Sequence, residues 1–222
     1  AKEYYEEALD IAIETGNVRG ERVTNRNLAS VFCSLGEYQK AKEYCEKALD
    51  IAIDIGERLG EGDECDALGN VYYGLGKNRL AKEYWDKAVG VSLATGDRML
   101  EADAAFSLGR VFASVNDNEK AKEHFERALT ISRECGFRGL EPRIYLHLGN
   151  LSQSLGEYGK AKDYLEKACS LSSQLGEKIC EFKSFLSISL LKIEHSEIVD
   201  AKKHLLQCIG KYEQIRTSLK RN

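Results

Sequence analysis

Histidine and cysteine are the residue types in this chain that could supply nucleophilic, acid–base or metal chemistry. The four histidines are scattered, and no third ligand at metal-binding spacing accompanies the pair His195 and His204. The seven cysteines contain no CxxC motif. The glycines form neither a GxGxxG nor a GxxxxGK loop, and the many carboxylates are interspersed with lysines. These patterns predict a protein that is not an enzyme, with no catalytic residue, bound metal or cofactor.

The composition favours a helical protein. Of the 222 residues, 43 % are hydrophobic, 31 % are charged and one is proline, and the net charge is −4. An odd number of cysteines without paired spacing favours reduced thiols, and we expect a cytoplasmic location. No apolar run is long enough to span a membrane, and no signal peptide opens the sequence. Because the chain begins in mid-repeat, we expect it to be part of a longer protein.

A segment of the form "AKEYCEKALDIA" recurs every forty residues, beginning at Ala1, Ala41, Ala81, Ala121, Ala161 and Ala201. In the second copy, Ala41, Cys45 and Ala48 share one face of a predicted amphipathic helix. Glu43 and Lys47 lie on the other face, where their i,i+4 spacing predicts an ion pair. This charged face is typical of a surface that meets water.

The first five copies of the recurring helix are each followed by a glycine that suits a left-handed helix end, and then by a second amphipathic segment. In that second segment a small residue recurs, as at Gly69 and Gly149, which lets a neighbouring helix approach closely. Pro142 predicts that one such helix begins near Glu141, later than its counterparts. Stacked helix pairs of this kind predict an all-α, right-handed solenoid of antiparallel pairs, with about eleven helices.

The segment "LGNVYYGLGKNRLAKEYWDKAV" (residues 68–89) resembles a tetratricopeptide repeat, with Ala81, Trp85 and Ala88 at the positions typical of its second helix. The forty-residue period resembles that of the G-protein-signalling modulators, and "LLQCIGKYEQIRTSLKRN" (residues 205–222) resembles the junction between such arrays and a CHAT domain. We therefore expect a single array. Its predicted parts are a helix B of a truncated unit (1–16), full units (17–56, 57–96, 97–136 and 137–176), and a divergent terminal unit with a tail (177–222).

The resemblance implies that helix A of each unit lines a concave groove that holds an extended peptide. The positions matching that groove vary from unit to unit, and asparagine and arginine there could bind a peptide backbone or a carboxylate. The groove candidates are Arg26, Asn27, Asp63, Asp66, Asn70, Asp103, Arg110, Arg143, His147, Asn150 and Lys183. The lysine and asparagine set that clamps an EEVD-type ligand is not recognisable here.

The terminal unit differs because "SFLSISLLKI" (residues 184–193) is apolar nearly all round. Leu186, Leu190 and Ile193 would face the groove. Two interpretations stay open: the tail after Lys211 covers these side chains, or they form an apolar docking surface.

The sequence thus supports two hypotheses about function. The first is a protein-interaction scaffold that binds a protein or peptide in the helix A groove. The second is a structural or regulatory array that self-associates, or that docks and controls an adjacent domain, for example a CHAT-type protease. Residues 201–222 are basic, but the rest of the chain is acidic and lacks interleaved aromatic residues, so we expect no nucleic-acid partner.

Overall fold

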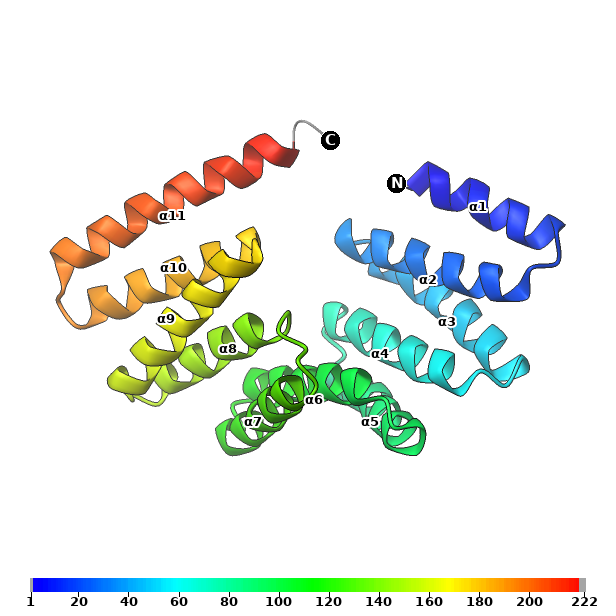
Figure 1. Cartoon of the computed structure of the whole chain (residues 1–222), viewed down its shortest axis with the longest axis horizontal. Coiled ribbons are helices and arrows are strands. Elements are labelled where there is room, and N and C mark those ends of the chain that lie inside the picture. The colour runs from blue at the N-terminus through cyan, green and yellow to red at the C-terminus, as the bar shows by residue number, and fades with distance from the viewer. Residues whose placement is uncertain (1, 220–222) are drawn as a thin grey trace. The chain divides into compact units, whose positions relative to one another are not determined.

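The computed structural model describes residues 2–219, and within that range the chain forms eleven α-helices joined by short turns (Figure 1). The helices are α1 (Lys2–Glu14), α2 (Val18–Ser34), α3 (Tyr38–Asp54), α4 (Arg58–Gly74), α5 (Asn78–Thr95), α6 (Arg98–Ser114), α7 (Asn118–Glu134), α8 (Glu141–Ser154), α9 (Tyr158–Leu175), α10 (Lys178–Glu194) and α11 (Ile198–Leu219). Even-numbered helices are helices A and odd-numbered helices are helices B. The predicted all-α fold of sequential antiparallel pairs is confirmed.

The chain divides into two compact units, Ala1–Val115 with α1–α6 and Asn116–Asn222 with α7–α11. Within each unit every helix packs against the next, and α4 also contacts α2 and α6, as α10 contacts α8. Helices A therefore lie side by side within a unit. A solenoid arises when each repeat packs against its sequence neighbours in the same way.

The recurring alanine at the start of helix B is a core residue in every copy that the structure describes. Ala41, Ala81, Ala121 and Ala161 have no exposed surface, and Ala201 has almost none. A methyl group at this position lets two helix backbones approach closely, which accounts for the strict repetition of alanine there.

Helix A carries the matching small residue, as predicted. A Cβ atom added to Gly69 would lie 2.5 Å from Nε1 of Trp85, and one added to Gly149 would lie 2.6 Å from Cγ of Leu165. Trp85 and Leu165 are both fully buried. The two glycines are therefore required by a large neighbouring side chain.

Helix α8 begins at Glu141, with Pro142 in its first turn, so this sequence prediction is confirmed. The residue before it, Leu140, is fully buried, and its apolar side chain cannot cap the helix with a hydrogen bond. Helix α6 instead begins with a side-chain cap, since the carboxylate of Asp97 accepts from the backbone N–H groups of Met99 and Leu100.

The predicted i,i+4 ion pair between Glu43 and Lys47 is wrong. The ammonium group of Lys47 lies 5.5 Å from the ring centroid of Tyr44, and Lys87 lies 4.7 Å from the centroid of Tyr84. A tyrosine three residues earlier thus attracts the lysine through its ring face. Ion pairs form instead one position earlier, for example between Lys42 and Glu46.

Two turns between helices use a residue other than glycine in a left-handed conformation, and one of them is Ser196, with φ of 62°. Because a Cβ atom is unfavourable there, Ser196→Gly should stabilise the chain by about 1 kcal/mol. The converse change, Gly156→Ser, places a side chain at φ of 72° in otherwise open space and should destabilise it by a similar amount. Urea unfolding midpoints measure both; a shift of the same sign in the two variants would contradict the argument.

Among residues 2–219, no helix is long and apolar enough to cross a membrane.

Candidate peptide-binding groove

The predicted groove residues lie on α2, α4 and α6 in the first unit and on α8 and α10 in the second. In the first unit, contacts between neighbouring helices A tie several of these side chains together. Nη1 of Arg26 on α2 donates to Oδ2 of Asp63 on α4 at 2.7 Å, and both side chains are partly exposed. An ion pair in contact with water is worth at most about 1 kcal/mol, so a ligand charge can readily replace either partner.

Asp66 accepts a hydrogen bond with each of its carboxylate oxygens. Its Oδ1 accepts from the indole N–H of Trp85 at 2.9 Å, and its Oδ2 accepts from the Asn70 amide at 3.1 Å. Burial, and secondly the negative charge of Asp103, raise the pKa of Asp66 to about 6. The buried tryptophan of the core thus fixes the position of a groove side chain.

Arg110 on α6 is held by aromatic rings. Its guanidinium carbon lies 4.4 Å from the ring centroid of Tyr73 on α4 and 5.9 Å from that of Phe106. Stacking on a ring face orients the planar guanidinium. The structure therefore links Arg26 of α2 to Asp63 of α4, and Arg110 of α6 to Tyr73 of α4.

A buried charge cluster in the first unit was missed by the sequence interpretation. Nη1 of Arg22 donates to Oε1 of Glu64 at 2.7 Å, and Nε of Arg22 lies 3.3 Å from Oε2 of Glu57. Glu64 has no exposed surface, and burial raises its pKa to about 7 against the opposing charges of Arg26 and Arg22. The sequence did contain an indication. Glu64 occupies a repeat position that elsewhere holds only small or apolar residues, namely Thr24, Ala104, Ile144 and Ser184.

The raised pKa of Glu64 predicts how stability depends on pH. The unfolded chain loses this proton near pH 4.5, whereas the folded chain keeps it up to about pH 7. Between these values the folded state binds more protons, so the free energy of unfolding should fall as pH rises. In urea titrations from pH 4 to pH 8, Glu64→Gln should reduce this fall in the free energy of unfolding. The smaller fall that remains would come from Asp66, whose pKa is also raised. An unchanged slope in the variant would contradict the assignment.

In the second unit the groove candidates lie on α8 and α10. The ring of His147 lies 5.4 Å from that of Phe125, which places it against the core. Arg143, Asn150 and Lys183 are exposed. Beside Asn150, the amide of Gln153 on α8 donates to the carboxylate of Glu194 on α10 at 2.8 Å.

The apolar candidates of α10 remain open to solvent. Leu186, Leu190 and Ile193 are 37 %, 48 % and 43 % exposed. The tail packs elsewhere on α10, since Nζ of Lys211 lies 2.8 Å from Glu181 and the ring of Tyr212 lies 6.1 Å from that of Phe182. The interpretation that the tail covers the three side chains is therefore wrong for the described part of the tail; residues 220–222 lie outside it.

Comparisons with known proteins match this architecture. Residues 1–54 and 65–134 match one model of the tetratricopeptide repeat, and residues 142–175 match a second. No curated protein matches the sequence.

Three solved structures illustrate the similarity, and at these identities they show the fold alone. The crystal structure of BtubC (BKLC) from P. vanneervenii aligns with a TM-score of 0.77 and 18 % identity, over 96 % of this chain and 88 % of that chain. Aspartyl phosphate phosphatase F from Bacillus subtilis aligns with a TM-score of 0.72 and 14 % identity, over 95 % and 64 %. A signal transduction ATPase with a tetratricopeptide repeat sensor, PH0952 from Pyrococcus horikoshii, aligns with a TM-score of 0.69 and 20 % identity, over 91 % and 31 %.

The family matches cover both compact units, and they agree with the alternating helices A and B and with the glycines that admit Trp85 and Leu165. This chain belongs to the tetratricopeptide repeat family.

Proposed function

We propose that this chain is a non-enzymatic scaffold whose helices A bind an extended segment of a partner protein. Tetratricopeptide repeats are in general protein-interaction modules, and a groove of helices A is the surface that such a segment would follow. Asn27, Asn70 and Asn150 would hydrogen-bond the backbone of the segment. Arg110 and Arg143 would bind its carboxylates.

One observation carries this proposal. The repeat position of Asn70 is exposed or half-exposed in every unit, and its residue changes from unit to unit: Ser30, Asn70, Arg110, Asn150 and Leu190. The buried position of Ala41 holds alanine throughout. Repeated core residues preserve the fold, whereas a surface position that varies in side chain but stays open can distinguish one partner segment from another.

The test is the selection of binding sequences from a displayed library of linear peptides, followed by charge reversal in the groove. The double variant Arg110→Glu/Arg143→Glu should weaken the selected peptides at least about tenfold, because each lost charge-assisted hydrogen bond is worth roughly 1.5–3 kcal/mol. The control Arg79→Glu/Lys160→Glu reverses two exposed charges on helices B and should change little. Equal binding by both double variants and the unaltered chain would refute the proposal.

The exposed apolar surface of α10 favours a second candidate function, a regulatory array that self-associates or docks an adjacent domain. Leu186, Leu190 and Ile193 would form the contact. The ATPase with a tetratricopeptide repeat sensor gives an example of an array joined to a larger protein. The similarity of residues 205–222 to a CHAT junction supports a protease-like neighbour in particular. Light scattering over a range of concentrations tests self-association: a mass that stays monomeric, and is unaffected by Leu186→Ser/Leu190→Ser, would exclude it.

A further inference from the structure

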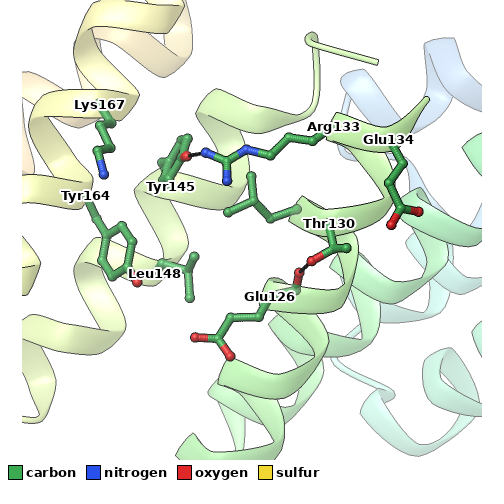
Figure 2. Close-up of a pocket in the computed structure, with 9 residues that line it drawn as sticks. Glu126, Thr130, Arg133, Glu134, Tyr145, Leu148, Tyr164 and Lys167 are labelled. Atoms are coloured by element: carbon green, nitrogen blue, oxygen red, sulfur yellow. Dashed lines mark hydrogen bonds between the residues drawn. The ribbon is translucent and has the colours of Figure 1, made fainter. Parts of the chain in front are cut away.

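The second unit contains a pocket formed by two helices B and by the helix A that lies between them in sequence. It has a volume of about 620 Å³ and lies between α7 and α9, with α8 behind it (Figure 2). We call it the tyrosine pocket, and define it by Leu129 and Arg133 of α7, Tyr145 and Leu148 of α8, and Tyr164 and Lys167 of α9. The volume falls within the range of about 300–1,000 Å³ that is typical of small-ligand sites.

The centre of the tyrosine pocket is the ring of Tyr145, which two cations flank. Figure 2 shows Arg133 extending from α7 to the Tyr145 hydroxyl, with Lys167 and Tyr164 on the opposite side. The guanidinium carbon of Arg133 lies 5.6 Å from the ring centroid of Tyr145, and Nζ of Lys167 lies 5.8 Å from it. Tyr145 and Tyr164 are stacked, with centroids 6.0 Å apart.

Hydrogen-bond donors remain available at this centre. Arg133 uses Nη2 on the Tyr145 hydroxyl and Nε towards Glu141 at 3.7 Å, which leaves Nη1. Tyr145 accepts from Arg133, and burial raises its pKa, so its own O–H stays protonated and can donate at neutral pH. Lys167 contacts the rings of Tyr145 and Tyr164, but within residues 2–219 no carboxylate lies within ion-pair distance of it.

Two glutamates, Glu126 and Glu134, also line the pocket. Glu126 lies 3.9 Å from Nζ of Lys122, and Glu141 lies beside Arg133. Of the two cations that define the pocket, Arg133 lies beside a carboxylate, whereas the described contacts of Lys167 are with aromatic rings. An anion placed beside Tyr145 would gain the ammonium of Lys167, Nη1 of Arg133 and the Tyr145 hydroxyl as donors.

Arg133 and Tyr145 occur together in a single forty-residue repeat of the sequence. At the repeat position of Arg133 the other units have Ile13, Ile53, Leu93 and Ser173. At the position of Tyr145 they have Asn25, Cys65, Ala105 and Phe185. The stacked lysine, by contrast, is shared with the first unit, where Lys87 lies over Tyr84. Packing of the repeat does not require Arg133 or Tyr145, since three other residue types serve at the first position and four at the second.

We propose that the tyrosine pocket binds a carboxylate attached to an apolar body, with the carboxylate between Arg133 and Lys167 and the apolar part against Leu129 and the ring of Tyr164, in front of the buried Leu148. The same chemistry is offered by a small monocarboxylic acid and by a glutamate flanked by an aliphatic residue in a partner protein. The site lies on helices B together with α8, so it is separate from the proposed peptide groove and its test does not depend on that groove.

The experiment is a titration of the full chain with hexanoate, followed by the methyl NMR signals of Leu129 and Leu148. Hexanamide, which has the same body without the charge, is the matched probe, and acetyl-Leu-Glu-amide represents a protein source of the carboxylate. Hexanoate or the dipeptide should shift both leucines while hexanamide does not, and the tighter of the two identifies the source. Equal shifts by hexanamide, or no shift by either acid, would overturn the proposal.

Variants locate the site. Arg133→Gln and Lys167→Gln, both at exposed side chains, should each weaken the acidic probe about tenfold, as expected for the loss of one charge-assisted hydrogen bond. Lys87→Gln is the matched control, because it removes the equivalent ring-stacked lysine in the first unit. An effect of Lys87→Gln as large as that of Lys167→Gln would show non-specific attraction to positive charge and would count against the pocket.

Discussion

Replacing Gly69 with alanine should destabilise the first unit by about 3 kcal/mol, the upper end of the cost of overpacking a core. The added Cβ would lie 2.5, 2.6 and 2.8 Å from three atoms of the Trp85 indole. That ring is fully buried and is tied to Asp66 through its N–H, so it has little freedom to move away. Unfolding in urea, followed by circular dichroism, measures the loss.

Gly90 supplies the control. It lies inside α5 with nothing within 4 Å of an added Cβ, so Gly90→Ala should stabilise the chain by about 1 kcal/mol through helix propensity alone. The double variant Gly69→Ala/Trp85→Cys reproduces the pair Ala29 and Cys45 of the preceding forty-residue repeat. Its loss in the free energy of unfolding should be smaller than the sum of the losses of the two single variants by at least about 1 kcal/mol. Additive effects would mean that the glycine and the indole do not constrain each other.

Removing the buried carboxylate of Glu64 should have a comparable effect for a different reason. Glu64→Ala at pH 8 leaves the guanidinium of Arg22 buried without its 2.7 Å partner, and breaking such a pair costs about 3–5 kcal/mol. Replacing both residues with apolar ones, in Arg22→Met/Glu64→Leu, removes the charges together and should restore the stability of the unaltered chain to within about 1 kcal/mol.

The exposed pair Arg26 and Asp63 joins the same two helices and provides the comparison. Arg26→Ala/Asp63→Ala should cost less than about 1 kcal/mol, since both side chains already contact water. If Glu64→Ala and this double variant lower the free energy of unfolding by the same amount, burial of Glu64 does not determine how much its ion pair contributes to stability.

The fold could be predicted from the sequence because the residues that determine it are local and repeated. Ala41 and its copies, the small residue at Gly69, and the glycines with positive φ each specify one feature of helix packing or helix ending, whatever lies elsewhere in the chain. Pro142 likewise acts through its own backbone geometry and gave the start of α8.

The site could be predicted only as a set of positions. Helical spacing indicates that Arg26 and Asp66 face the groove, but not that Arg26 pairs with Asp63 across two helices, or that Asp66 is held by Trp85. These contacts depend on the distance between neighbouring helices, which no single helix encodes. The error about Glu43 and Lys47 has a similar origin: helical spacing offered Lys47 two neighbours, and the ring of Tyr44 is the one it contacts.

The buried alanines at one position of helix B have a consequence for how such a chain can change. Ala41, Ala81, Ala121, Ala161 and Ala201 occupy the same place in packing, at intervals of forty residues without insertion. A gene duplication or deletion of forty codons would therefore keep these alanines in register, although pairs such as Gly69 and Trp85 would have to be kept together. The number of repeats could then vary by recombination at breakpoints that separate no such pair, and Arg133 and Tyr145, which occur together once, would be copied or lost together at such breakpoints.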